Sequence, residues 1–340
     1  MNYYHLLKYV VKSSPRTRIL GVITMHLLHA RYLFLSVDPS NGCNYRCRMC
    51  YRSSDLKPIG RHTLSEDDID NIIRAFGSET LRLQIGCAME PSIAYDQSLH
   101  LLKKAKKANI RFISMCTNGV LLTREKLEEL ASEGLDELII SCHGIHKETY
   151  EFFMRGKYDK FLQLLDNLCE VKSAYPQMKL RINYTMNADN TLELKDFFSV
   201  FSKIKPDTLQ LRPIQDIGSQ DYTNYDLTPV KEMYDSVIKP LAVQCREMGI
   251  QIILPELNNI ETLESNDRIN ALEDIFQKNT QVYISPDKCF SEDFDLSKDT
   301  YRSYCSSHGK TINLLKSLFI SGKQSEERLH SSTTALKYKL

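Results

Sequence analysis

Short β-like runs alternate with amphipathic stretches from residue 33 onward. Apolar residues in the runs follow the two-residue period of a strand, and those between them follow the period of a helix. The strands predicted from this pattern are LFLSV (33–37), LRLQI (81–85), RFISMC (111–116), ELIIS (137–141), LRINYT (180–185) and TLQLR (208–212). Strand, helix and strand repeated at this spacing predict parallel strands with right-handed crossovers, and six such units fit an open or closed β/α barrel.

The helical stretches carry end signals of their own. Ser65 and Thr123 stand where helix N-caps are expected, and Gly134 stands where a helix is expected to stop. After residue 213 the pattern loosens. Residues 228–249 look helical, and residues 250–257 predict one more strand or an edge strand.

One face of each predicted strand stays polar. In the fifth strand Arg181, Asn183 and Thr185 oppose an apolar face, and Arg82 and Arg212 occupy polar faces of the second and sixth strands. Parallel strands covered on both sides should be apolar on both faces. We therefore expect helices on the apolar face and a wide polar lumen, which favours a partial, splayed barrel. The same alternation also fits an antiparallel sheet exposed to water. Lumen-facing Arg82 and Arg212 would suit an anionic group on a substrate.

The predicted architecture is an α/β protein with a partial (β/α)6 TIM-like barrel of parallel strands, an N-terminal helix and a C-terminal extension. We divide the chain into a basic helical segment (1–31), the barrel core (32–257), an α-rich or irregular extension (258–320) and a tail expected to be disordered (321–340). Residues 1–37 contain no Asp or Glu. The N-terminal helix is expected either to pack on the fold or, as a basic amphipathic helix, to touch a membrane surface or an acidic substrate weakly.

Composition narrows the class of protein. The net charge is +1, which gives no reason to expect a nucleic-acid partner. The apolar stretch 19–35 is interrupted by His, Arg and Gly and lacks a signal-peptide cleavage site, so neither a membrane span nor secretion is expected, and the predicted location is the cytoplasm. The chain has ten cysteines, and in a cytosolic protein clustered cysteines indicate metal binding or catalysis more often than disulfides.

Three cysteines form one tight cluster, Cys43-x3-Cys47-x2-Cys50, directly after the first predicted strand. A structural zinc site needs four closing ligands, and no second cysteine pair lies nearby. Three thiolates instead suit a cubane iron–sulfur cluster that keeps one iron open to another ligand.

With its neighbours, this cluster resembles the radical S-adenosylmethionine (radical SAM) superfamily, and in particular the members that modify peptides and sugars. The motifs, in order, are CNYRCRMCY (43–51), GCAMEP (86–91) in place of the usual GGEP, CTNGVLL (116–122), residues 140–168 beginning ISCHG, and LRINYTMNADN (180–190). Two departures stand out. Ala88 and Met89 replace the paired glycines, and Cys142 and His143 replace the usual Leu-Asp after Ser141. We assign His143 no role.

The resemblance implies that Cys43, Cys47 and Cys50 hold a [4Fe–4S] cluster whose open iron chelates SAM. Reductive cleavage of SAM then gives a 5′-deoxyadenosyl radical that abstracts a substrate hydrogen. The residues that the resemblance places against SAM are Glu90 at the ammonium, Arg181 at the carboxylate, Asn183 at other polar groups, Ser141 and Asn118 at the ribose or methionine part, and the Met49 backbone and Tyr51 ring at adenine. The alternatives without a cofactor contact are a simple turn at Glu90-Pro91, a turn at Asn118-Gly119 and a solvated strand position for Arg181.

The implied enzyme is of oxidoreductase or transferase type. Its substrate is a small molecule or a peptide, such as a ribosomal peptide, a sugar or another metabolite, and its electron donor is a protein such as flavodoxin or ferredoxin. For an auxiliary cluster, Cys289 and Cys305 lie in the right region, with Cys245 further upstream; these are too few for the usual extension, and one cluster that borrows an upstream cysteine stays open. The alternatives are a non-catalytic iron–sulfur or zinc-binding scaffold and a degenerate member that cleaves SAM weakly. Whether SAM is consumed or regenerated stays open.

Overall fold

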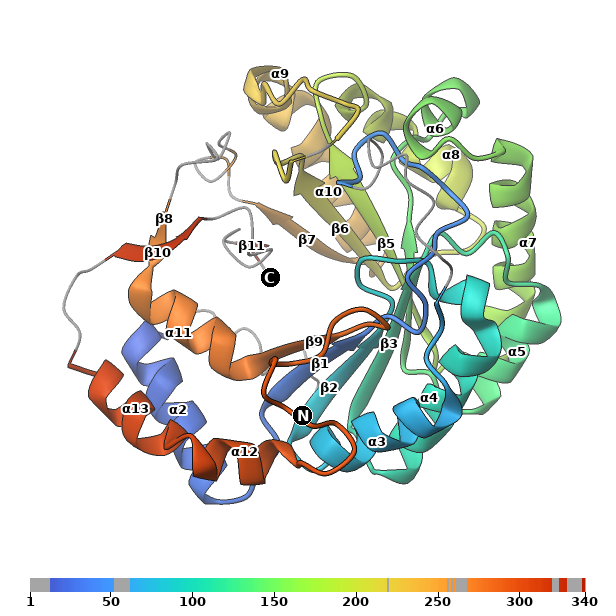
Figure 1. Cartoon of the computed structure of the whole chain (residues 1–340). Coiled ribbons are helices and arrows are strands. Elements are labelled where there is room, and N and C mark those ends of the chain that lie inside the picture. Colours follow the sequence, from blue (N-terminus) through green and yellow to red (C-terminus); the bar gives the residue numbers. More distant parts are fainter. Residues whose placement is uncertain are drawn as a thin grey trace.

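The computed structural model describes residues 13–51, 62–218, 220–255, 257, 260, 268–319, 324–328 and 338–339. Within them the chain forms a large, curved sheet with helices on its outer side (Figure 1). The strands of this sheet, in chain order, are β1 (Leu33–Val37), β2 (Thr80–Ile85), β3 (Phe112–Thr117), β4 (Glu137–Ser141), β5 (Lys179–Met186), β6 (Thr208–Pro213), β7 (Gln251–Pro255), β9 (Gln281–Ile284) and β11 (Tyr338–Lys339).

Strand order across the sheet is β11-β7-β6-β5-β4-β3-β2-β1-β9. All neighbours pair in parallel except β11, which runs antiparallel to β7. The sheet is not closed, because β9 and β11 stand at its two edges. The predicted α/β partial barrel and its six strands are confirmed, and residues 251–255 supply the additional strand. Strand β9 was not predicted.

Helices follow the strands in the order of a β/α repeat. They are α3 (Glu66–Phe76), α4 (Tyr95–Lys107), α5 (Arg124–Ser132), α6 (Lys147–Met154), α7 (Tyr158–Ala174), α8 (Phe197–Phe201), α9 (Thr228–Glu232) and α10 (Lys239–Glu247), with short helical turns η1 (Pro91–Ala94), η2 (Thr191–Asp196) and η3 (Tyr234–Ile238). Both predicted N-caps are confirmed. Ser65 forms a reciprocal capping box with Asp68, and the Thr123 hydroxyl accepts from the Lys126 amide.

A second layer of helices packs beside β1 and β9 (Figure 1). It consists of α2 (Pro15–Leu27), α11 (Ala271–Thr280), α12 (Tyr301–Ser307) and α13 (Lys310–Ser317). Buried Ile19, Val22 and Ile23 of α2 meet Leu272 and Leu314 in a small hydrophobic cluster. The N-terminal helix therefore packs on the fold, which was the first of the two possibilities predicted for it. No helix among the described residues is long and apolar enough to cross a membrane.

The C-terminal residues contribute strands where we expected a disordered tail. Residues 324–328 form β10, which pairs antiparallel with β8 (Arg268–Asn270), and β11 extends the main sheet. Of the predicted tail, residues 321–323, 329–337 and 340 lie outside the described part of the chain.

The two faces of the sheet differ as the alternation predicted. Toward the carboxyl ends of the strands, one face carries half-buried polar or small side chains, namely Gln84, Cys116, Ser141, Asn183 and Arg212. Their apolar neighbours on the other face are buried in the main core. Because the helices cover the apolar face, the polar face is the inner, lumen face of the partial barrel.

Candidate active site

The loop after β1 brings the three clustered cysteines to the carboxyl edge of the sheet. Cys43 is exposed, and Cys47 and Cys50 are half-buried. The Cys50 amide donates to the Cys47 carbonyl at 3.0 Å, and the Tyr45 amide donates to Cys43 Sγ at 3.4 Å. These local bonds fold the segment back on itself, so that its thiols are presented from one short turn.

The end of α6 holds this loop in place. The Arg48 amide donates to the Phe153 carbonyl at 2.9 Å, and Arg48 Nε donates to the Phe152 carbonyl at 3.1 Å. The Cys47 thiol donates to the Met154 carbonyl at 3.5 Å. The cysteine loop is therefore fixed to α6, the helix that follows β4, and not only to its own strand.

The donor set fits an iron–sulfur cluster. Burial raises the pKa of the Cys47 thiol, and the charges of Cys43 and Cys50 raise it further, so the other two sulfurs lie within electrostatic range of Cys47. Among the described residues no three His, Cys, Asp or Glu side chains are arranged to hold one metal ion. In a cubane each thiolate binds a different iron, so its ligands need not converge on a single point.

Glu90 is buried and already fully engaged by this chain. Its Oε1 accepts from the Ser92 amide at 3.0 Å and from the hydroxyls of Ser92 and Thr117. Its Oε2 accepts from the Asn118 amide at 2.7 Å and from Asn118 Nδ2 at 2.5 Å. Burial raises the pKa of Glu90, and these hydrogen bonds oppose the rise. The carboxylate thus joins the loop after β2 to the loop after β3.

Asn118 connects this carboxylate to the cysteine loop. Its Nδ2 donates to Asn44 Oδ1 at 2.8 Å as well as to Glu90. Gly119 beside it has φ of 78°, and a Cβ there would lie 2.5 Å from Leu164 Cδ2. The turn predicted as one alternative for Asn118-Gly119 is therefore present, and it brings a predicted site residue against the segment that carries the cysteines.

Asp38 is a residue that the sequence interpretation missed. It is fully buried at the end of β1 and accepts from the amides of Cys87 at 2.7 Å and Ala88 at 3.1 Å, and from the Tyr283 hydroxyl at 2.6 Å. It therefore fixes the GCAM segment, in which side chains replace the usual glycines, and ties it to β9. Its signal in the sequence was a carboxylate directly after a buried strand.

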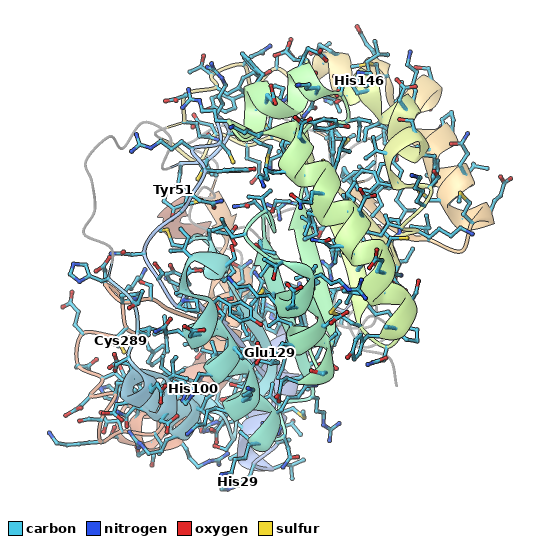
Figure 2. All side chains as sticks on the ribbon, turned by 90° about the vertical axis from the view of Figure 1, so that its right-hand side faces the viewer. His29, Tyr51, His100, Glu129, His146 and Cys289 are labelled. Carbon is cyan, nitrogen blue, oxygen red and sulfur yellow. The ribbon has the colours of Figure 1, made fainter. Side chains whose placement is uncertain are left out.

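Met49 and Tyr51 flank the last cysteine. The Met49 carbonyl accepts from Gln220 Nε2 at 2.7 Å, and its Sδ accepts from Asn187 Nδ2 at 3.1 Å. The Tyr51 ring is 39% exposed and lies toward the outside of the molecule (Figure 2). The backbone of Met49 is thus anchored from the segment after β6, and the adenine contacts expected for these two residues remain predictions.

Ser141 and Asn183 pair with each other across β4 and β5 on the lumen face. Ser141 Oγ lies 3.9 Å from Cys116 Sγ. The Oδ1 atom of Asn183 is buried and has no hydrogen-bond partner among the described residues. An acceptor left unsatisfied at this position fits the polar cofactor groups that the resemblance places here.

Arg181 has a partner that the sequence interpretation did not anticipate. Its Nη2 lies 2.7 Å from Glu137 Oε2, and its Nη1 donates to Gln210 Oε1 at 3.1 Å. Both members of the ion pair are buried, and Glu137 is the first residue of β4. Arg181 therefore stands at the amino half of the strands. This placement argues against the predicted contact with the SAM carboxylate, because the guanidinium is used within the protein and lies at the opposite end from the cysteines. The alternative of a solvated strand position is also wrong.

Arg82 is used in a similar way. It is buried, its guanidinium lies over the rings of Phe34 and Phe112, and its Nη2 donates to Ser114 Oγ at 3.3 Å. Like Arg181, it is near the amino end of its strand. These contacts anchor Arg82 at the amino end of the lumen. Arg212, by contrast, lies on the lumen face near the carboxyl end of β6.

The thiols of Cys87 and Cys116 complete the carboxyl edge. Cys87 is exposed and Cys116 is half-buried. Desolvation raises the pKa of Cys116 to about 11 and that of Cys87 to about 12, while the charge of Arg212 acts in the opposite direction on both. Both thiols are therefore protonated at neutral pH.

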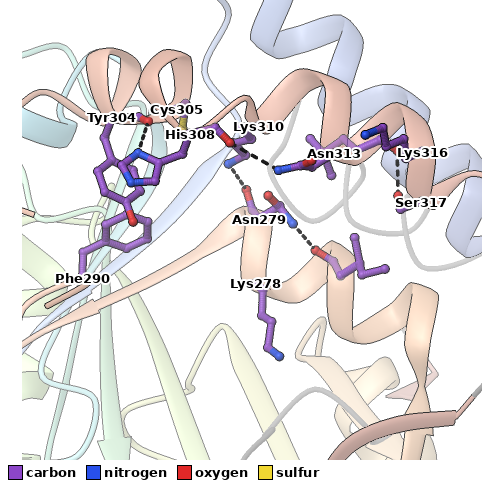
Figure 3. A pocket seen from close by; sticks show the side chains of 12 residues that line it. Lys278, Asn279, Phe290, Tyr304, Cys305, His308, Lys310, Asn313, Lys316 and Ser317 are labelled. Carbon is purple, nitrogen blue, oxygen red and sulfur yellow. Dashed lines mark hydrogen bonds between the residues drawn. The ribbon is translucent and has the colours of Figure 1, made fainter. Parts of the chain in front are cut away.

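Cys305 lies in α12 of the second helical layer, and Cys289 lies in the segment between β9 and α12. Cys305 is buried and lines a pocket between α11, α12 and α13, and Cys289 is half-buried (Figure 3). Lys278, Lys310 and His308 also line this pocket. The auxiliary cluster considered from the sequence therefore stays untested.

Comparison with known families identifies one match. The model of the radical SAM superfamily matches residues 37–184, which contain the last residue of β1, the cysteine loop, strands β2 to β4 and all of β5 except its last two residues. The matched segment therefore includes the cysteines, Glu90, Asn118, Ser141 and Asn183.

Two comparisons give the relatives. A curated protein named probable GTP 3′,8-cyclase, from Sulfolobus acidocaldarius, is 24% identical over 242 residues, covering 66% of this chain and 74% of that protein. The crystal structure of Streptococcus suis SuiB bound to precursor peptide SuiA is similar with a TM-score of 0.58 at 19% identity, covering 78% of this chain and 61% of that one. SuiB bound to S-adenosylmethionine matches with a TM-score of 0.57 at 20% identity, covering 75% and 59%. The chain thus spans about three-fifths of SuiB, and at this identity the likeness concerns the fold.

Proposed function

We propose that the protein is a radical SAM enzyme whose cluster is held by Cys43, Cys47 and Cys50, from the premise that residues 37–184 match the radical SAM superfamily. The observation that carries the proposal is the turn of three thiols at the carboxyl edge of the sheet, next to a polar lumen. When bound, a [4Fe–4S] cluster supplies the electron that cleaves SAM reductively to a 5′-deoxyadenosyl radical, which abstracts hydrogen from the substrate.

The chain's own residues hold the cysteine loop in position. Helix α6 holds the cysteine loop through Arg48, and Gln220 holds the Met49 carbonyl from the other side. Glu90 and Asn118 fix the neighbouring loops against Asn44 of the cysteine loop. Because these bonds come from several strands, the loop is preorganised before any cofactor binds, which lowers the ordering cost of binding.

We propose that SAM lies along the lumen face between the cysteine loop and the ends of β4 and β5. Asn183 offers its unsatisfied Oδ1, and Ser141 offers its hydroxyl. Asn118 and Met49 border the same region from the loops, and a contact of the exposed Tyr51 ring with adenine stays a prediction. Glu90 acts there by positioning Asn118, since both of its oxygens are already used. A direct contact between its side chain and the SAM ammonium would have to displace these donors.

Two substrate classes have specific support. The curated relative is named as a GTP 3′,8-cyclase, which favours a nucleotide or other small metabolite. The SuiB structure holds a precursor peptide, which favours a ribosomal peptide. A reducing protein such as flavodoxin or ferredoxin would supply the electron in either case. Anaerobic incubation of the reconstituted protein with SAM, reductant and GTP, or with candidate precursor peptides, separates the classes by which addition increases 5′-deoxyadenosine above the level with SAM alone.

The central proposal is tested without knowing the substrate. Anaerobic reconstitution with iron and sulfide should give a brown protein that releases 5′-deoxyadenosine from SAM on reduction. Cys47→Ala should lose both the chromophore and the product. Cys169→Ala is the matched control, because Cys169 lies on α7 outside the cysteine loop and its thiol donates to the Lys203 carbonyl at 3.8 Å. A colourless protein that binds zinc, with no product from SAM, would refute the proposal in favour of a metal-binding scaffold.

A further inference from the structure

Arg212 stands at the carboxyl end of β6, on the lumen face. It is half-buried, and it pairs in register with Thr185 of β5. The Thr185 amide in turn donates to His143 Nδ1, which brings His143 to the same level of the sheet as Arg212. The positive charge of Arg212 also lowers the pKa values of Cys87, Cys116 and His143, so these side chains lie within its electrostatic range. No hydrogen bond or ion pair joins it to another residue in the described part of the chain. A guanidinium with five donors is rarely left without acceptors in a partly buried site.

His143 lies beside Arg212 in a fixed protonation state. The Thr185 amide donates to His143 Nδ1 at 3.1 Å, so this nitrogen is an acceptor and the proton of the neutral ring resides on Nε2. Burial and then the charge of Arg212 lower the pKa of His143 to about 4, against an opposing backbone contact at Cys142. Asn190 Nδ2 donates to the His143 carbonyl at 3.1 Å and fixes the backbone. At neutral pH the His143 ring is therefore uncharged and fixed in orientation, and its Nε2–H is available as a hydrogen-bond donor.

The nearby carboxylates do not neutralise Arg212. Asp38 accepts from the amides of the loop after β2 and from Tyr283, and Glu90 accepts from Ser92, Thr117 and Asn118. In addition, His143 occupies the position where the resembling motif has Asp. This chain therefore has a neutral donor at the position where the resembling motif has an acid.

We propose that Arg212 and the Nε2–H of His143 together bind an anionic group of the substrate, a phosphate or a carboxylate, at the carboxyl end of the lumen. The inference rests on the proposed function for the meaning of "substrate", and it adds the chemical class. Arginine suits such groups because its planar fork can donate two parallel bonds. A second source of the same chemistry is the carboxylate of SAM itself, and the experiment separates the two sources.

The test is a binding measurement on the reconstituted, unreacted protein. Calorimetric titrations use inorganic pyrophosphate and succinate as phosphate and carboxylate probes, and SAM as the competing source. Wild type should bind at least one probe saturably. Arg212→Gln should weaken that binding about 10- to 100-fold, the loss expected for a charge-assisted pair, and leave SAM affinity within about twofold. Arg111→Gln makes the same charge change at an exposed position just before β3 and should alter neither affinity.

His143 variants sharpen the outcome. His143→Asp should weaken probe binding as strongly as Arg212→Gln, because the new carboxylate would pair with the arginine. His143→Gln keeps an N–H donor and should retain most of the binding. Absence of saturable probe binding by the wild type, or probe affinities unchanged in Arg212→Gln, would overturn the proposal. SAM affinity that falls in Arg212→Gln as much as probe affinity would assign the arginine to SAM instead. Release of 5′-deoxyadenosine by the wild type tests the proposed function separately.

Discussion

Replacing Arg181 with Met tests whether this arginine holds the barrel together or binds the cofactor. The ion pair with Glu137 joins β5 to β4, with side chains 7% and 0% exposed. Removing the arginine leaves a carboxylate buried with its main partner lost, and breaking such pairs costs about 3–5 kcal/mol. We expect a loss of unfolding free energy in that range for Arg181→Met. The double variant Arg181→Met/Glu137→Gln should recover part of the loss, because it removes the uncompensated charge.

Urea denaturation of wild type, Arg181→Met, the double variant and Lys179→Met, followed by circular dichroism, gives the free energies of unfolding. Lys179→Met is the matched control, since Lys179 begins the same strand and pairs with Asp207 at 3.2 Å with its side chain 53% exposed. An exposed pair of this kind contributes about 0–1 kcal/mol. The structural interpretation is refuted if Arg181→Met costs no more than Lys179→Met while its affinity for SAM drops by tenfold or more.

Three further predictions concern stability. Asp38→Asn should lose about 1–3 kcal/mol in urea denaturation, because the new amide group would face the donors of the loop after β2, and an unchanged midpoint would contradict this role. Ser65→Ala should cost about 1 kcal/mol through loss of the α3 cap, measured in the same way, and a loss below a few tenths would contradict it. Partial burial lowers the pKa of Lys310 from 10.5 to about 8, so the folded protein binds fewer protons than the unfolded chain between these pH values, and the contribution of Lys310 to stability rises with pH there. The difference in unfolding free energy between Lys310→Met and wild type at pH 7 and pH 10 should therefore shift by about 1–3 kcal/mol in favour of wild type at the higher pH, and a constant difference would refute the assignment.

The sequence was sufficient for the strands that follow a clear helix and loop. Each predicted strand in the β/α repeat has a two-residue period and is separated from its neighbours by a helix with recognisable ends, such as the one capped by Ser65. Strand β9 has no such boundary. It begins at Gln281, directly after the last residue of α11, and it pairs with β1, which lies more than 200 residues earlier. Its formation depends on that distant pairing, so local periodicity could not reveal it.

The sequence predicted which loops come together at the site, but not the hydrogen-bond partners of the side chains in them. The order of the motifs placed Glu90 and Asn118 at adjacent strand ends, and the structure brings them together. The sequence could not show that both oxygens of Glu90 accept hydrogen bonds from neighbouring residues. Its donors are the amides of Ser92 and Asn118 and two hydroxyls, and no sequence pattern indicates which backbone amides or hydroxyls a carboxylate will bind. Asp38 was missed for the same reason, since backbone amides are its main partners.

Arg181 and Arg212 show why face alone does not locate a site residue. Alternation placed both on the lumen face, and both are there. Their depth along the sheet differs, because Arg181 pairs with Thr208 at the start of β6, whereas Arg212 pairs with Thr185 near the end of β5. Four residues of strand separate the two levels, or about 13 Å. Only the upper level lies at the carboxyl ends of the strands, where parallel β/α folds bind their ligands. The arginine at the lower level is free to serve the ion pair with Glu137, and the one at the upper level, next to a histidine in place of an acid, is left to meet an anion from outside the chain.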